Sequence, residues 1–166
     1  MVYLIGVPLL LTLAILQSSV FSHLQLLDGR PDLVLLAVLS WSLAGRHKEA
    51  MLLGLIGGLF LDLLSGLPFG SHAIILVLVI YLVASFEDRF WEAHLLLPLS
   101  MSLIASLVFH GLEIGTILLM GRSFDLAYVM TRIVLPSAFL NLVLALPASQ
   151  LAEGLRTRLY PPEVEI

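Results

Sequence analysis

Long apolar runs separated by short polar segments dominate the chain from Val2 to Leu151. Charged residues, glycines or prolines mark each interruption, and a helix of about 20 apolar residues crosses the hydrocarbon core of a bilayer. The pattern therefore predicts a bundle of about six transmembrane helices. The expected spans are Val2–Phe21, Pro31–Ala44, Ala50–Leu64, His72–Phe86, His94–Met120 and Thr131–Leu151.

The second of these runs is short. Asp28-Gly29 before it is typical of a turn, and Pro31 is expected in the first turn of the helix, where helices tolerate proline. If this run turns back inside the bilayer instead of crossing it, the chain has five spans. The pattern leaves both arrangements open.

Composition places the chain in a membrane. Hydrophobic residues make up 60% of its 166 residues, charged residues make up 12%, and the mean hydropathy is +1.07, whereas soluble domains carry about 25% charged residues. We therefore expect an all-α integral membrane protein, with residues 1–152 as one transmembrane domain and 153–166 as a short polar cytoplasmic tail. Membrane lipid is then a partner, and the net charge of −4 argues against nucleic acid.

The distribution of basic residues predicts the orientation. Six spans place both termini on one side of the membrane, together with five basic residues, against three in the loops of the other side. Because basic loops stay in the cytoplasm, we expect both termini there. The two sets are Arg46, Lys48, Arg89, Arg156 and Arg158, and Arg30, Arg122 and Arg132.

An acidic residue lies inside an apolar run in the stretch "GLFLDLLSGLPFGSHA". Asp62 is about 18 Å along the helix from Ala50, hence in the outer half of the bilayer. His72 follows the Gly66-to-Gly70 break and begins the next helix on the same side. We expect Asp62 to hold this turn by accepting hydrogen bonds from backbone N–H groups or from His72; a ligand or proton site is the alternative.

Three more polar residues lie in later spans. His110 and Glu113 are three residues apart and share a helical face, but two residues do not make a metal site, so an interhelical hydrogen bond is expected of them. The same is expected of Asn141. No nucleophile has a base at a suitable spacing, so the sequence predicts no catalytic residue, no metal and no cofactor.

Two pairs of glycines have the spacing that lets helices approach closely. They are Gly54 with Gly58, and Gly111 with Gly115. The second pair lies beside His110 and is a candidate contact for a partner helix.

The stretches "GRPDLVLLAVLSW" and "GLIGGLFLDLLSGLPFGSHAIILVLVIYLV" resemble the rod shape-determining membrane protein family MreD. The resemblance is concentrated between Pro31 and Leu82, and Asp32 belongs to its Pro-Asp start. Its central motif places an acid, two glycines, a proline and a histidine in register. These are Asp62, Gly66, Pro68, Gly70 and His72.

The resemblance implies a non-enzymatic scaffold of the bacterial cell-wall elongation machinery in the inner membrane. Its implied partners are an MreC-like bitopic protein, a RodA-type polymerase with a class B penicillin-binding transpeptidase, and, indirectly, MreB filaments. The family is also similar in fold to the substrate-binding component of energy-coupling-factor transporters. The alternative function is therefore a small-molecule-binding transporter subunit with an outward-facing polar pocket.

Overall fold

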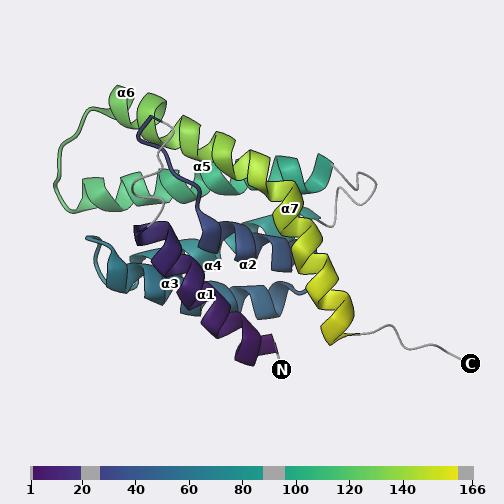
Figure 1. The fold of residues 1–166 in the computed structure, drawn as a ribbon. Helices are drawn as coiled ribbons and strands as arrows, with labels where there is room; N and C mark the ends of the chain where they lie inside the picture. The colour runs from purple at the N-terminus through teal and green to yellow at the C-terminus, as the bar shows by residue number, and fades with distance from the viewer. Residues whose placement is uncertain (1, 20–26, 88–95, 161–166) are drawn as a thin grey trace, which may run out of the picture.

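The structure, a computed structural model, describes residues 2–19, 27–87 and 96–160, and the regular structure in these ranges is helical (Figure 1). Helices α6, η1 and α7 follow one another without a break, so the described chain forms six helical rods. The all-α prediction is confirmed. The elements are α1 (Val2–Ser19), α2 (Leu33–Leu43), α3 (His47–Leu64), α4 (Ser71–Glu87), α5 (Leu96–Leu119), α6 (Leu126–Val129), η1 (Met130–Val134) and α7 (Leu135–Leu159).

Three of the rods are long and apolar enough to cross a membrane by themselves. They are α1, α5 and the continuous helix Leu126–Leu159. Helix α2 has only 11 residues, or about 16 Å, against a hydrocarbon core of about 30 Å. The fold is a bundle of helices compatible with a membrane protein, in which α2 needs its neighbours to cover it.

Helix α2 lies at the centre of the bundle, in contact with α1, α3, α4, α5 and α7 (Figure 1). Helix α2 itself carries apolar side chains on every side, as expected for a buried helix. Val34, Leu35, Val38 and Leu39 are each at most 2% exposed. The shortness of this run therefore reflects its central position.

A non-helical segment leads into α2 and lies along the last long helix. The N–H groups of Asp28, Arg30 and Asp32 donate to the Arg132 carbonyl (3.1 Å), Ser137 Oγ (3.0 Å) and Asn141 Oδ1 (2.7 Å). Non-helical backbone at membrane depth needs such partners inside the protein because lipid offers none. η1 and α7 thus supply the hydrogen-bond acceptors that this segment needs.

Pro136 explains why the Arg132 carbonyl is free to accept a hydrogen bond from the N–H of Asp28. Residue 136 would normally donate its N–H to the carbonyl four residues earlier, and proline has no N–H. The helix widens into the π-helical turn η1 immediately before it. The placement of Pro31 in the first helical turn was wrong: Pro31 belongs to the non-helical segment, since α2 begins at Leu33 with Asp32 as its N-cap.

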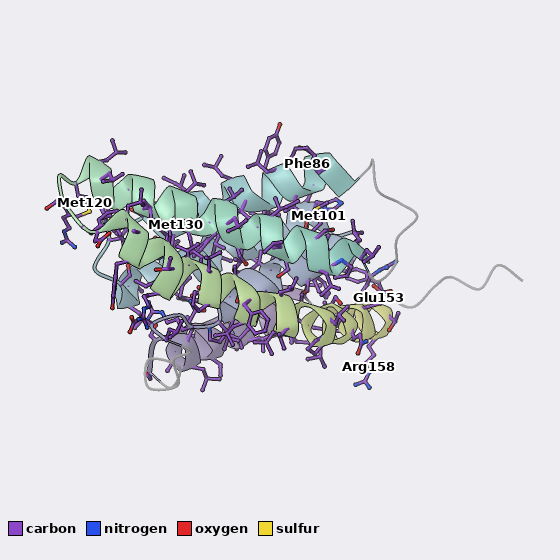
Figure 2. All side chains as sticks on the ribbon, turned by 90° about the horizontal axis from the view of Figure 1, so that it is seen from above. Phe86, Met101, Met120, Met130, Glu153 and Arg158 are labelled. Atoms are coloured by element: carbon purple, nitrogen blue, oxygen red, sulfur yellow. The ribbon has the colours of Figure 1, made fainter. Side chains whose placement is uncertain are left out.

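Both ends of the described chain lie at the same end of the bundle. Figure 2 shows Glu153 and Arg158 there, and Met120 and Met130 at the opposite end. Tyr160, just after α7, donates a hydrogen bond to Glu49 (2.8 Å), and this bond raises the pKa of the tyrosine. The helix continues through residues 153–159, so the first half of the expected polar tail is helical; residues 161–166 lie outside the described residues.

The two glycine pairs have different environments. A Cβ at Gly58 would overlap the backbone of Ala73, and one at Gly54 would lie 3.3 Å from Val38 Cγ1. This pair brings α3 against α4 and α2. A Cβ at Gly111 or Gly115 would meet nothing within 4 Å, so the second pair lies on a face that the described part of the chain leaves uncovered.

Gly58→Ala should destabilise the protein because the backbone of Ala73 cannot move away without separating α3 from α4. The expected loss is about 1–3 kcal/mol, seen as a lower thermal unfolding temperature in detergent. Gly111→Ala is the matched control, and its better helix propensity should leave stability unchanged or raise it by up to about 1 kcal/mol. Equal stability of the two variants would contradict the close packing at Gly58.

Candidate functional site

Asp62 lies in the last turn of α3, with its side chain fully buried. One carboxylate oxygen accepts the backbone N–H (2.9 Å) and the ring Nδ1 (2.8 Å) of His72, and the other accepts the N–H groups of Gly70 (2.9 Å) and Ala73 (3.4 Å). His72 and Ala73 are in the first turn of α4, where N–H groups have no partner within the helix. Asp62 therefore caps α4 from the end of α3.

The Gly66-to-Gly70 break shapes this cap. Gly70 has φ = +95°, a conformation that favours glycine, and the Pro68 carbonyl accepts the N–H of Ser71 (3.1 Å). Gly66 is exposed and a Cβ there would meet nothing within 4 Å. Gly70 therefore has a structural reason for its identity, whereas the contact of the Pro68 carbonyl is open to any residue and nothing in the structure requires glycine at position 66.

Glu113 joins the two histidines. Its Oε1 lies 3.0 Å from His72 Nε2 and its Oε2 lies 2.9 Å from His110 Nδ1. The second contact is the one that the spacing of three residues on α5 predicts. The first connects α5 to α4, so both carboxylate oxygens of Glu113 are used in holding the two helices together.

Asp32 and Asn141 continue the contacts to α2 and α7. Asn141 Nδ2 donates to Asp32 Oδ2 (2.8 Å) and to Ser106 Oγ (2.9 Å), and the Asp32 N–H donates back to Asn141 Oδ1. His110 Nε2 lies 3.1 Å from Asp32 Oδ2, at ion-pair distance, although the ring N–H is poorly aligned with that oxygen. Asn141 thus makes the interhelical contacts expected of it.

These contacts form one continuous polar chain through the bundle. It connects α3, α4, α5, the start of α2 and α7, and Phe109 packs its ring against both imidazoles, 6.1 and 5.5 Å away between centroids. Each member is buried except Glu113, whose side chain is 23% exposed. The polar chain consists of Asp62, His72, Glu113, His110, Asp32, Asn141 and Ser106.

A cavity of about 610 Å³ lies beside the polar chain, toward the end of the bundle opposite the termini. Four members of the chain line it, and so do the two arginines Arg30 and Arg122. Apolar side chains from α3, α5, η1 and the loop before α6 form the rest of its wall, including Leu61, Phe109, Ile117 and Phe124. The four polar-chain members are Asp32, His72, His110 and Glu113.

The sequence positions of most of these residues suggested local contacts, and the structure joins them into one network. Ser106 and the contact between His110 and Asp32 were missed, because Ser106 looks like one of many serines in an apolar helix. Its spacing from His110, one helical turn, is the only signal that could have indicated it. Gly111 and Gly115 lie on another face of α5 and take no part in the polar chain.

The polar chain does not have the arrangement of a metal centre. Within residues 2–19, 27–87 and 96–160, no group of three or more His, Cys, Asp or Glu side chains could hold a metal ion. The carboxylates and imidazoles contact one another directly instead of converging on a common point. Chemically, the arrangement forms hydrogen bonds between carboxylates and imidazoles in the interior of the bundle.

Asp62→Leu should destabilise the protein because four N–H donors lose their acceptor in a fully buried place. We expect a loss of about 3 kcal/mol or more, with a smaller loss for Asp62→Asn, which keeps one acceptor oxygen. The measurement is thermal unfolding of the purified protein in detergent. Asp125→Leu is the control: Asp125 caps the exposed start of α6, and its loss should cost about 1 kcal/mol. Similar losses for Asp62→Leu and Asp125→Leu would contradict the capping role.

Comparison with known proteins connects this structure to one family. The model of the family described as rod shape-determining protein MreD matches residues 1–153 of the chain. No curated protein and no solved structure matches it. The match covers every described helix up to the last turns of α7 and includes the whole polar chain. The chain belongs to the MreD family of rod shape-determining proteins.

Proposed function

We propose that the protein is a non-enzymatic scaffold of the cell-wall elongation machinery in the bacterial inner membrane. Family membership supports a role in rod shape determination. In the proposed complex the chain contacts an MreC-like bitopic protein and, through it or directly, a RodA-type polymerase with its class B penicillin-binding transpeptidase. MreB filaments are an indirect partner on the cytoplasmic side.

One face of α5 supports this proposal. Four exposed positions and the half-buried Gly115 recur at helical spacing and form a stripe along the helix, with two glycines in the middle of apolar side chains. A groove of small residues lets a second helix approach closely, where dispersion contacts favour association in lipid. The stripe consists of Ile104, Leu107, Gly111, Gly115 and Leu118.

The geometry around His72 supports the non-enzymatic part of this proposal. Ser65 Oγ lies 3.5 Å from His72 Nδ1, so a serine, a histidine and an aspartate are neighbours. In a catalytic triad the serine and the aspartate contact opposite ring nitrogens. Here Ser65 and Asp62 approach the same nitrogen and Glu113 occupies the other, so His72 cannot relay a proton from Ser65.

The cavity favours the second candidate function, a small-molecule-binding subunit. Its volume of about 610 Å³ is within the range of ligand pockets, and it combines apolar walls with charged groups. The two functions differ in what purification recovers, since a scaffold should co-purify with a bitopic partner after mild crosslinking.

The proposed orientation predicts the behaviour of reporter fusions. A reporter that is active only in the cytoplasm should work after Ile166 or within the loop from Arg46 to Glu49, and should fail within Gly66 to Gly70. The reason is that α3 carries the chain from the end that holds the termini to the opposite end. Activity of the reporter within Gly66 to Gly70 would reverse the orientation.

Replacing Gly111 and Gly115 together with leucine should weaken the scaffold without unfolding it. The two side chains would fill the groove on α5, so recovery of the bitopic partner should fall at least about tenfold, which corresponds to about 1.4 kcal/mol, and cells should lose their rod shape. Thermal stability should stay unchanged because a Cβ at either position meets nothing.

Gly154→Leu is the matched control for that experiment. Gly154 is also exposed, with nothing within 4 Å of a Cβ, but it lies near the end of α7. If the control lowers partner recovery as much as the double variant does, the α5 stripe is not the interface. If the double variant keeps its partner but loses binding of a vitamin or metal ion in calorimetry, the transporter-like function replaces the scaffold.

A further inference from the structure

Two arginines on the cavity wall have no acceptor of their own. Arg30 lies in the non-helical segment before α2, Arg122 follows the end of α5, and both residues are exposed. Neither guanidinium makes a hydrogen bond or an ion pair within the part of the chain that the structure describes. Residues 20–26, which connect α1 to the segment before α2, contain no acidic residue. The two positive charges are therefore available to a ligand.

The two acids of the cavity wall, in contrast, already have donors. The two carboxylate oxygens of Glu113 contact His72 Nε2 (3.0 Å) and His110 Nδ1 (2.9 Å). Asp32 Oδ2 accepts a side-chain N–H of Asn141 (2.8 Å). These carboxylates are used in holding the helices together, so they are not free to bind a cation.

The acids also lie deeper in the bundle than the arginines. Glu113 is six residues, or about 9 Å, before the end of α5, whereas Arg122 follows that end. The N–H of Arg30 donates to Ser137, one helical turn nearer the same end of the bundle than the contact that Asp32 makes with α7. The arginines are therefore nearer the mouth of the cavity, away from the carboxylates.

Gln17 adds a buried donor to the wall. It is 7% exposed, and its Oε1 accepts the N–H of Val34 (3.2 Å), which fixes the orientation of the carboxamide. Its Nε2 has no acceptor among the described residues. The hydroxyl of Ser123 lines the same cavity. The groups left for a ligand are thus mainly donors, and a ligand that satisfies them brings acceptor oxygens and negative charge.

Apolar side chains make up most of the remaining wall. They come from α3, α5 and the segment between the loop before α6 and η1, and they include Leu64, Ile117, Phe124 and Ile133. A small anion gains nothing from such a wall, whereas hydrocarbon is stabilised by it. We propose that the cavity binds an anionic phospholipid, with its phosphate on the two arginines and its hydrocarbon against the apolar wall.

The chemistry of the two arginines fits a phosphate. A guanidinium presents several N–H groups in one plane and binds phosphate oxygens in pairs, and basic pockets between membrane helices bind lipid headgroups. The volume of about 610 Å³ is within the range of ligand pockets. The cavity lies toward the end of the bundle that holds Met120 and Met130 (Figure 2), and helix ends reach the level of the headgroups. The inference concerns the chain alone and does not depend on the proposed partners.

The first test measures the affinity of the full chain for dioleoyl phosphatidylglycerol by native mass spectrometry from detergent. Dioleoyl phosphatidylcholine has the same acyl chains and a headgroup without net charge, and we expect it to bind at least about tenfold more weakly. Arg30→Gln and Arg122→Gln should each lower the affinity for phosphatidylglycerol at least about tenfold, since each removes a charge-assisted contact. Thermal stability should stay unchanged because neither guanidinium has a partner within the described ranges.

Arg132→Gln is the matched control. Arg132 is an exposed arginine at the same end of the bundle that does not line the cavity, and its contact with Asp28 uses the backbone carbonyl. This variant should keep the wild-type affinity for phosphatidylglycerol. Equal affinities for the two lipids, or an equal loss in all three variants, would overturn the proposal.

Free phosphate is the other source of the same chemistry. A large excess of inorganic phosphate or glycerol 3-phosphate should not displace the lipid, because neither has hydrocarbon for the apolar wall. Displacement by either compound would assign the cavity to a soluble anion and overturn the lipid site.

A photoreactive phosphatidylglycerol, with a diazirine in the upper part of one acyl chain, locates the bound lipid in the wild-type protein. We expect crosslinks on the cavity wall, at Ile117, Phe124 or Ile133. Crosslinks confined to the outer surface, for example at the exposed Leu78 of α4, would overturn the proposal. This result decides the question if an arginine variant does not fold.

Discussion

The carboxylate of Asp62 is the contact on which the arrangement of this bundle depends. A membrane-embedded helix has no water to satisfy the N–H groups of its first turn, and lipid offers no acceptors. Asp62 supplies acceptors from the neighbouring helix, and in doing so fixes where α4 begins and how His72 is oriented. That orientation also places the opposite nitrogen of the same ring against Glu113, which connects α4 to α5.

The same constraint explains the irregular entry into α2. The segment before α2 has no helical hydrogen bonds of its own, and Arg132, Ser137 and Asn141 accept its N–H groups. Pro136 makes this possible by leaving the Arg132 carbonyl without its usual donor. Pro136 removes one hydrogen bond from its own helix, and the carbonyl that it leaves free accepts a hydrogen bond from the segment before α2. This contact helps to join residues 28–32 to the last long helix.

These internal contacts and the outer surface have separate tasks. The polar chain and the Gly54–Gly58 packing hold the helices of one molecule together. Among the described residues, nothing lies within 4 Å of a Cβ placed at Gly111 or Gly115 in the stripe on α5. This separation fits the proposed scaffold, since a partner helix can dock on α5 without disturbing Asp62, His72 or Glu113. It also means that interface variants and core variants can be told apart by stability measurements.

The amino-acid pattern predicts the membrane class, most of the helices and two local contacts. Hydropathy accumulates along the chain regardless of packing, so the apolar runs indicate helices directly. Asp62 and His72 are separated by only ten residues and a Gly-Pro break, and His110 and Glu113 by one helical turn. Such contacts follow from local geometry.

That these pairs form one network, and that one glycine pair is internal while the other is open, depends on how the helices pack against one another. His72 reaches Glu113 across 41 residues and Asp32 reaches Asn141 across 109. Whether two such residues meet depends on which face each helix turns toward its neighbours. Side-chain packing around α2 determines which face each helix turns inward. The positions of apolar residues in the sequence do not reveal that face when a helix is hydrophobic on every side.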